Sequence, residues 1–169
     1  WVPNLISGEW QGTMCLTEAG AGSDVGASLT KATPIEGNRY QIEGSKVFIT
    51  SGEHDLTENF VHIVLARVEG DPPGVKGLSI FIIPKYRLDD KGANGEYNDV
   101  FCSGIEEKMG IHASVTTTLE FGRNGGCEGY LIGNRCDGIK IMFQIMNEER
   151  IAVGQQGQGL AAVAYGHAM

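Results

Sequence analysis

The chain has 169 residues, of which 41% are hydrophobic and 20% are charged. This composition allows a buried core and excludes an intrinsically disordered chain. The formal net charge of −8 at pH 7 disfavours contact with nucleic acid or an anionic membrane surface, although it permits a local pocket for an anionic ligand.

Short β-branched and aromatic runs, separated by Gly, Pro, Asn and Asp, fill most of the chain and predict strands. The expected strands are residues 12–17, 28–35, 39–44, 46–52, 60–68, 77–84, 97–104 and 116–122. A hairpin turn is expected at Gly37-Asn38, and loops at residues 69–77 and 89–99. Closely spaced strands without helical periods between them favour an antiparallel barrel or sandwich over a Rossmann fold.

The pattern changes to a helical one near Asp137, which is placed to cap the start of a helix. One apolar face is formed by Ile139, Met142, Phe143 and Met146. The glycines beyond Arg150 each cost about 1 kcal/mol in a helix relative to Ala, so we expect them to pack closely on another element. The chain begins without Met and stops inside this expected helix, so we expect it to be a piece of a longer protein.

The four cysteines form no C-x-x-C motif, and no histidine pair has the spacing of a metal ligand set. We therefore expect reduced thiols, a cytoplasmic protein and no metal site. The most apolar run, residues 78–84, is far too short to cross a bilayer, and no signal peptide is visible.

Residues 14–32, MCLTEAGAGSDVGASLTKA, form a glycine-rich stretch with several possible uses. Its glycine spacing differs from the dinucleotide fingerprint, a strand pattern follows it, and no Gly-Lys-Ser/Thr of a P-loop is present. Glu18 and Asp24 are too few acids for a calcium loop. Two interpretations stay open: a connector between strands, or a concave anion site in which backbone N–H groups and the Ser23 hydroxyl bind a pyrophosphate.

Phe48 and Thr50 lie two residues apart on one face of an expected strand. An aromatic ring beside a hydroxyl suits a flat heteroaromatic ligand with polar edge atoms. The alternative is an ordinary core aromatic and an ordinary strand threonine.

Four motifs, in order along nearly the whole chain, resemble those of the acyl-CoA dehydrogenase family. MCLTEAGAGSDVG (14–26) resembles TEPGAGSD, and GSKVFITSG (44–52) resembles G-x-K-x-W-I-T. EEKMGIHASVTTTLEF (106–121) resembles a later K-M-G-x-x-x-S-x-T strand pair, and residues 131–165 resemble the opening of the family's C-terminal helical domain. Residues 51–70 and 109–114 further resemble the branch that contains methylmercaptopropionyl-CoA dehydrogenase and related broad acyl-CoA dehydrogenases.

The resemblance implies a mainly β fold: an antiparallel β-barrel of two orthogonal sheets, followed by the start of a C-terminal α-helical domain. Residues 1–136 would form the middle β-barrel domain, and residues 137–169 the first helix of the truncated helical domain. Two departures from the family pattern are Ala19 in place of proline and Phe48 in place of tryptophan.

The resemblance also implies FAD as cofactor and an acyl-CoA as substrate. The FAD-binding residues would be Met14, Leu16, Thr17, Gly22, Ser23, Phe48, Ile49 and Thr50. Thr17 would bind the pyrimidine edge of the flavin, Thr50 would lie close to its N5, and Gly22 and Ser23 near the pyrophosphate. The substrate-binding residues would be Ser23, Asn147 and Arg150.

The implied reaction is the α,β-dehydrogenation of an acyl-CoA thioester, with a carboxylate base and hydride transfer to flavin N5. In most of the family the base lies in the C-terminal helical domain, which would place it beyond residue 169. In a minority it lies on the helix that begins near Asp137, just before an arginine, where Glu149 precedes Arg150. The alternative for Glu149 is a solvated helix acid paired with Arg150 or Lys140.

An electron-transfer flavoprotein or similar acceptor and assembly into a homodimer or homotetramer are the implied partners. Other functions stay open: a flavin-binding relative such as an acyl-CoA oxidase or an alkylation-response protein, or a β-domain that is inactive alone.

Overall fold

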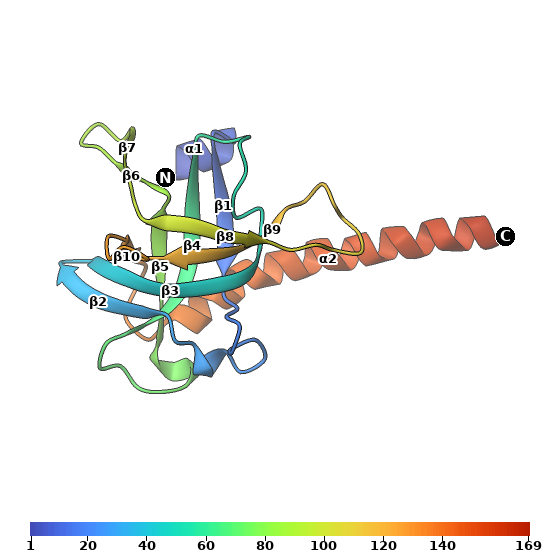
Figure 1. Cartoon of the computed structure of the whole chain (residues 1–169). Coiled ribbons are helices and arrows are strands. Elements are labelled where there is room, and N and C mark those ends of the chain that lie inside the picture. Colours follow the sequence, from blue (N-terminus) through green and yellow to red (C-terminus); the bar gives the residue numbers. More distant parts are fainter.

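Ten strands and one long helix make up most of the computed structural model, which describes residues 1–169 (Figure 1). The strands are β1 (Trp10–Cys15), β2 (Lys31–Glu36), β3 (Arg39–Thr50), β4 (Asn59–Val68), β5 (Leu78–Pro84), β6 (Tyr86–Leu88), β7 (Asn94–Tyr97), β8 (Val100–Ile105), β9 (Thr116–Phe121) and β10 (Glu128–Leu131). The helices are α1 (Val2–Ser7) and α2 (Gly138–Ala168), and two 3-10 turns lie at Val25–Ala27 and Val75–Gly77.

Five strands close into a barrel in the order β2–β3–β10–β5–β4, with β4 pairing back onto β2. Strand β1 adds to the ring beside β4, and the C-terminal half of β3 leaves the ring to pair with β9, which carries β8. The expected mainly β barrel with a following helix is therefore confirmed.

Strand direction differs from the antiparallel expectation at two pairs. Strand β4 pairs in parallel with β1, from Trp10 opposite Asn59 to Cys15 opposite Val64, and in parallel with the start of β2. Runs of β-branched and aromatic residues favour strands of either direction, so the sequence pattern located these strands without fixing their directions.

Strand β3 is one continuous strand where the sequence predicted two, at residues 39–44 and 46–52. Its pairing partner changes from β2 to β9 at Gly44, whose φ is +158° and where an added Cβ would lie 2.5 Å from Thr30 Oγ1, so only glycine fits. A single strand thus takes part in both the barrel and the β9–β8 extension. The expected hairpin turn before it is present, with Gly37 at φ +58°.

Three other elements lie where the sequence pattern was uninformative. Strand β10 is short and contains Gly129, and helix α1 has only six residues. The β6–β7 ribbon places β7 inside residues 89–99, which were predicted to form a loop. A four-residue strand is too short for its alternation to be distinguished from a turn.

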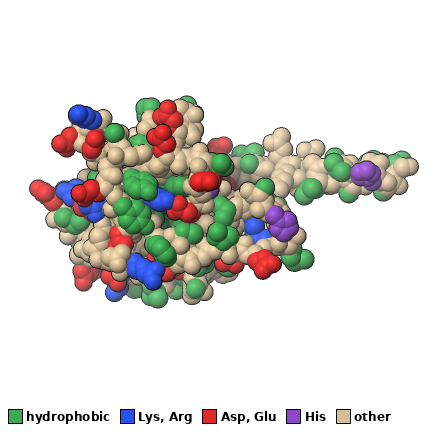
Figure 2. Space-filling view, turned by 45° about the horizontal axis from the view of Figure 1, so that its top comes forward, with side chains coloured by type: hydrophobic (Ala, Val, Ile, Leu, Met, Phe, Trp, Pro, Cys, Tyr) green, Lys and Arg blue, Asp and Glu red, His purple; other side chains and the backbone are tan.

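Helix α2 packs its first turns against the outside of the barrel and then projects away from it (Figure 1). Asp137 occupies the expected N-cap position, although its side chain makes no capping hydrogen bond. Met142 is buried against Leu65, Leu78 and Ile80, whereas Phe143 of the predicted apolar face is 45% exposed. Hydrophobic side chains recur along the projecting part of the helix (Figure 2).

The glycines of the projecting part contact no other element of this chain, since nothing lies within 4 Å of a Cβ built at Gly154, Gly157 or Gly159. The expected close packing partner for them stays a prediction. Neither α1 nor α2 is long and apolar enough to cross a membrane.

Candidate functional site

A cleft of about 410 Å³ opens between the C-terminal ends of β1 and β3 and one side of α2. Its lining includes six of the predicted cofactor-binding residues: Met14, Leu16, Thr17, Phe48, Ile49 and Thr50. Thr17 and Thr50, far apart in the sequence, thus share one cavity, with half of the lining residues hydrophobic. The cleft therefore combines apolar side chains with the side chains of two threonines, a lining that suits a heteroaromatic ligand with polar edge atoms.

A β-bulge in β3 joins the two segments of this wall. Lys46 pairs with Leu119 and Ile49 with Thr117, so β3 has one residue more than β9 over this interval. The displaced Val47 N–H donates to the Thr17 carbonyl at 2.9 Å instead of to the ladder. The bulge thereby fixes the end of β3 against the chain that follows β1.

Phe48 has a left-handed backbone with φ +60°, an uncommon conformation for a residue with a bulky side chain. Its side chain is 62% exposed and lines the cleft instead of joining the core. Ser51, also in the lining, has φ +51°. Strain of this kind is kept where the surrounding structure imposes it, which is common in ligand sites.

Gly22 and Ser23 lie outside the lining of the cleft, in the exposed loop between β1 and β2. The loop begins with a tight turn in which Ala21 N–H donates to the Glu18 carbonyl at 3.0 Å, so Ala19 supports a turn without the family's proline. A Cβ at Gly22 would lie 3.9 Å from Thr17 Cγ2, so the loop passes directly beside the cleft.

Asn147 and Arg150 lie on α2 and are joined to each other, with Arg150 Nη1 donating to Asn147 Oδ1 at 3.2 Å. The Arg150 guanidinium also stands over the Phe143 ring at 5.5 Å. Arg150 lines a second depression of about 230 Å³, which shares Met14 and Glu149 with the main cleft. The two depressions are therefore adjacent, and Asn147 is in the lining of neither.

Glu149 lines both depressions and faces the wall formed by β1 and β3. It takes part in none of the ion pairs of the chain, including any with Arg150 or Lys140. The carboxylate is exposed and makes no ion pair with Arg150 or Lys140, so a solvated helix acid and a group that acts on a ligand in the cleft are both compatible with its position.

A buried ion pair behind the cleft was not anticipated from the sequence. Lys46 Nζ lies 2.8 Å from Glu18 Oε1, and the Lys46 side chain is completely buried. Burial alone would raise the pKa of Glu18, but hydrogen bonds from Lys46, Ser28 and Thr30 outweigh it and lower the pKa to about 2. In strand β3, Lys46 points to the same side as the buried Tyr40 and Ile42, because alternate side chains of a strand share a face. This spacing is a sequence signal that the Lys46 charge faces the core, where it requires an acidic partner.

A second buried polar pair lies beneath the cleft wall. The Nδ1 atom of His62 is 2.7 Å from Thr13 Oγ1, which is also 3.4 Å from Cys15 Sγ. Burial, with a smaller contribution from Lys85, lowers the pKa of His62 to about 3, so the ring is neutral at pH 7. Because Nε2 has no partner, we assign the proton to Nδ1, which then donates to Thr13.

Comparison with known proteins identifies the family to which this region belongs. The model of the "Acyl-CoA dehydrogenase, middle domain" family matches residues 13–123. The butyryl-CoA dehydrogenase of Syntrophomonas wolfei is 48% identical over 98% of this chain, and the 3-methylmercaptopropionyl-CoA dehydrogenase of Ruegeria pomeroyi is 44% identical over 100% of it. The chain spans 28% of the length of each of these relatives.

Among solved structures, the acyl-CoA dehydrogenase of Bacillus anthracis complexed with FAD superposes with a TM-score of 0.67 at 31% identity. The superposition covers 89% of this chain and 23% of that one. The chain therefore belongs to the acyl-CoA dehydrogenase family and contains that family's middle domain.

Proposed function

We propose that this chain is the flavin-facing middle domain of an FAD-dependent acyl-CoA dehydrogenase, which oxidises an acyl-CoA thioester between its α- and β-carbons. The observation that carries the proposal is the shared cleft of Thr17, Phe48 and Thr50, linked by the hydrogen bond from Val47 N–H to the Thr17 carbonyl. The FAD of the related Bacillus anthracis structure and the acyl-CoA substrates named for the two relatives support it.

The residues present fit a flavin ring. The exposed Phe48 ring supplies an aromatic face, Met14, Leu16 and Ile49 supply apolar contact, and the two threonine hydroxyls are free to bind polar edge atoms. Gly22 and Ser23, in the loop beside the cleft, would hold the pyrophosphate through backbone N–H groups and a hydroxyl. Ser23, Asn147 and Arg150 would border the substrate.

Bound FAD would supply the acceptor for the hydride that leaves the β-carbon of the thioester. The protein must remove the α-proton, and Glu149 is the carboxylate of this chain that lines the cleft. An apolar acyl chain beside a carboxylate makes it a stronger base, since desolvation disfavours its charge. We therefore propose Glu149 as the base, with a carboxylate outside residues 1–169 as the alternative.

The wider assignments are part of the same proposal. Residues 1–136 would form the middle domain, and residues 137–169 would begin a helical domain whose other helices cover the exposed apolar side chains of α2. The protein would act in fatty acid metabolism as a cytoplasmic homodimer or homotetramer that passes electrons to an electron-transfer flavoprotein. The four unpaired cysteines support the cytoplasmic location.

The test is turnover of the intact protein with a panel of acyl-CoA thioesters, an artificial electron acceptor and, separately, oxygen. Acceptor-dependent formation of the enoyl product supports a dehydrogenase, and oxygen-dependent turnover supports the oxidase alternative. Glu149→Gln removes the base while keeping size, and should lower kcat by about 10²-fold or more without loss of FAD. Unchanged kcat in this variant would place the base elsewhere.

A further inference from the structure

The cleft is assembled from two segments that do not belong to neighbouring strands of the sheet. Leu16 and Thr17 follow β1, whereas Phe48 to Thr50 end β3, and strands β1 and β3 are not hydrogen-bonded neighbours in the sheet. A flat ligand held between them requires their separation to be fixed by something other than the ladder. The Glu18–Lys46 ion pair bridges this gap, since Glu18 follows Thr17 directly and Lys46 stands two residues before Phe48.

Lys46 holds the segment that follows β1, which contains Leu16 and Thr17. Its ammonium donates to the Leu16 carbonyl at 3.1 Å as well as to Glu18 Oε1 at 2.8 Å. The adjacent Val47 N–H reaches the Thr17 carbonyl at 2.9 Å. Three consecutive residues, 16–18, are thus bound by two consecutive residues of the bulged strand.

The Glu18 side fixes the glycine-rich loop. Its carboxylate accepts hydrogen bonds from Leu29 N–H at 2.7 Å, from Thr30 N–H at 3.1 Å and from the Thr30 hydroxyl at 2.6 Å. The Ser28 hydroxyl donates to the same carboxylate. Both ends of residues 19–27, which include Gly22 and Ser23, are therefore held by one buried group.

Stability alone does not account for such a pair. Replacing a buried ion pair by apolar groups of similar volume is often neutral or stabilising, because the cost of desolvating two charges can exceed their attraction. The pair instead specifies one arrangement. The hydrogen bonds of Glu18 and Lys46 join residues 16–18, residues 28–30 and strand β3, and only one relative placement of these three segments satisfies all of them.

We propose that Glu18 and Lys46 are positioning residues for the flavin, which set the separation of Thr17 from Phe48 and Thr50 and anchor the pyrophosphate loop. This inference rests on the proposed function. Neither side chain lines the cleft, so both act through their neighbours. Removing both charges together should leave a folded protein whose cleft binds the flavin poorly.

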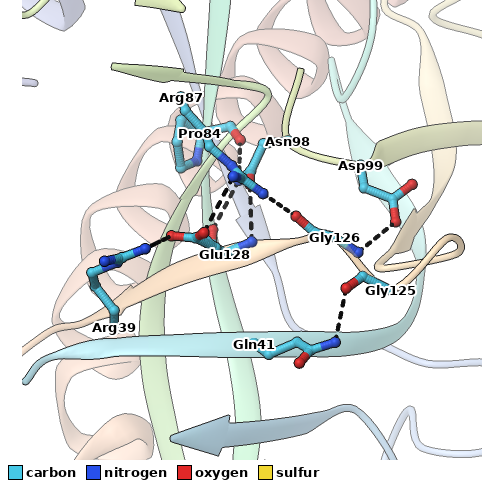
Figure 3. Close-up of polar contacts among 9 residues, drawn as sticks. All are labelled: Arg39, Gln41, Pro84, Arg87, Asn98, Asp99, Gly125, Gly126 and Glu128. Carbon is cyan, nitrogen blue, oxygen red and sulfur yellow. Dashed lines mark hydrogen bonds and ion pairs between the residues drawn. The ribbon is translucent and has the colours of Figure 1, made fainter. Parts of the chain in front are cut away.

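The experiment compares FAD dissociation constants and the visible absorption spectrum of the bound flavin in the intact wild-type protein and in the double variant Glu18→Gln/Lys46→Met. The matched control is Arg39→Met/Glu128→Gln, an ion pair of 2.7 Å at the opposite end of β3 (Figure 3). Circular dichroism verifies the fold of each variant. Glu18→Asp, which keeps the charge and shortens the side chain, should recover part of the affinity relative to Glu18→Gln.

We expect the double variant to bind FAD at least about tenfold more weakly, with a shifted flavin spectrum, and the control to match wild type. Wild-type affinity and spectrum in a folded double variant would overturn the positioning role and leave the proposed function intact. Wild-type protein that binds no FAD would instead contradict the proposed function, before any variant is compared. If the double variant does not fold, the Ser28→Ala variant is the test. FAD binding about threefold weaker than that of wild type supports the proposal, and an unchanged FAD dissociation constant contradicts it.

Discussion

The two ends of β3 are held by polar networks of different character. At the N-terminal end, Arg39 pairs with Glu128, and the buried Asn98 side chain donates to the carbonyls of Pro84 and Glu128 (Figure 3). At the C-terminal end, Glu18 and Lys46 meet behind the cleft. The first network stands partly in water, with the Arg39 side chain 42% exposed, whereas Lys46 is entirely excluded from it.

The residues next to the two networks differ as well. Around Glu128 the neighbouring strands β10, β3 and β5 are regularly paired. Beside Lys46 the strand is bulged, Phe48 and Ser51 have left-handed backbones, and a large aromatic ring is exposed. The first network closes the barrel, and the second holds an irregular surface in one conformation. Three predictions test this contrast, in order of decreasing effect on stability.

The largest effect is expected from Lys46→Met alone. It leaves the Glu18 carboxylate buried without its counter-charge, and should lower the free energy of unfolding by about 3–5 kcal/mol. Glu128→Gln at the partly exposed end should cost only about 1 kcal/mol or less. Thermal unfolding of the intact protein measures both, and equal losses would remove the contrast.

The next effect is the loss of stability in acid. The pKa of His62 is lowered to about 3 in the folded chain, from 6.5 when unfolded, so the unfolded state binds the additional proton between these values. Stability should therefore fall by about 3 kcal/mol from pH 7 to pH 4. Below about pH 4.5 the loss continues, since the stabilising ionisation of Glu18, with a pKa of about 2, is lost as the pH falls further.

The free energy of unfolding, measured between pH 4 and pH 7, tests whether His62 causes the loss of stability in acid. His62→Leu, whatever its effect at pH 7, should flatten the curve between pH 4 and pH 7. A slope identical to that of wild type would show that another group governs the acid sensitivity.

The smallest effect is expected at Phe48. Asparagine tolerates a left-handed backbone better than phenylalanine, so Phe48→Asn should leave stability unchanged or raise it by up to about 1 kcal/mol. FAD binding should weaken because the aromatic face is lost. Ile111→Asn is the matched control, since Ile111 has φ +55° and lies outside the cleft lining. Destabilisation by Phe48→Asn, or unchanged FAD binding, would contradict this interpretation.

Much of this architecture was readable from the sequence because it follows local patterns. The β-branched and aromatic run from Phe60 to Val68 predicted a strand, and the spacing of Met142 and Met146 predicted the packed turns of α2. Thr17, Phe48 and Thr50 were assigned to one site through motifs, and the structure brings them into one cleft.

The remainder depends on contacts between distant segments, which local patterns do not record. The parallel pairing of β1 with β4 and the four-residue β10 are set by the closure of the ring. The bulge in β3 depends on its register with β9. The pairing of Lys46 with Glu18 is not predictable from local pattern, because 28 residues separate the two in the sequence.

The most direct measurement is a crystal structure of the intact protein with FAD bound. We expect the flavin ring to lie against Phe48, between the hydroxyls of Thr17 and Thr50, with its pyrophosphate beside Gly22 and Ser23. A flavin located elsewhere in the protein, with this cleft filled by solvent or by side chains, would contradict it.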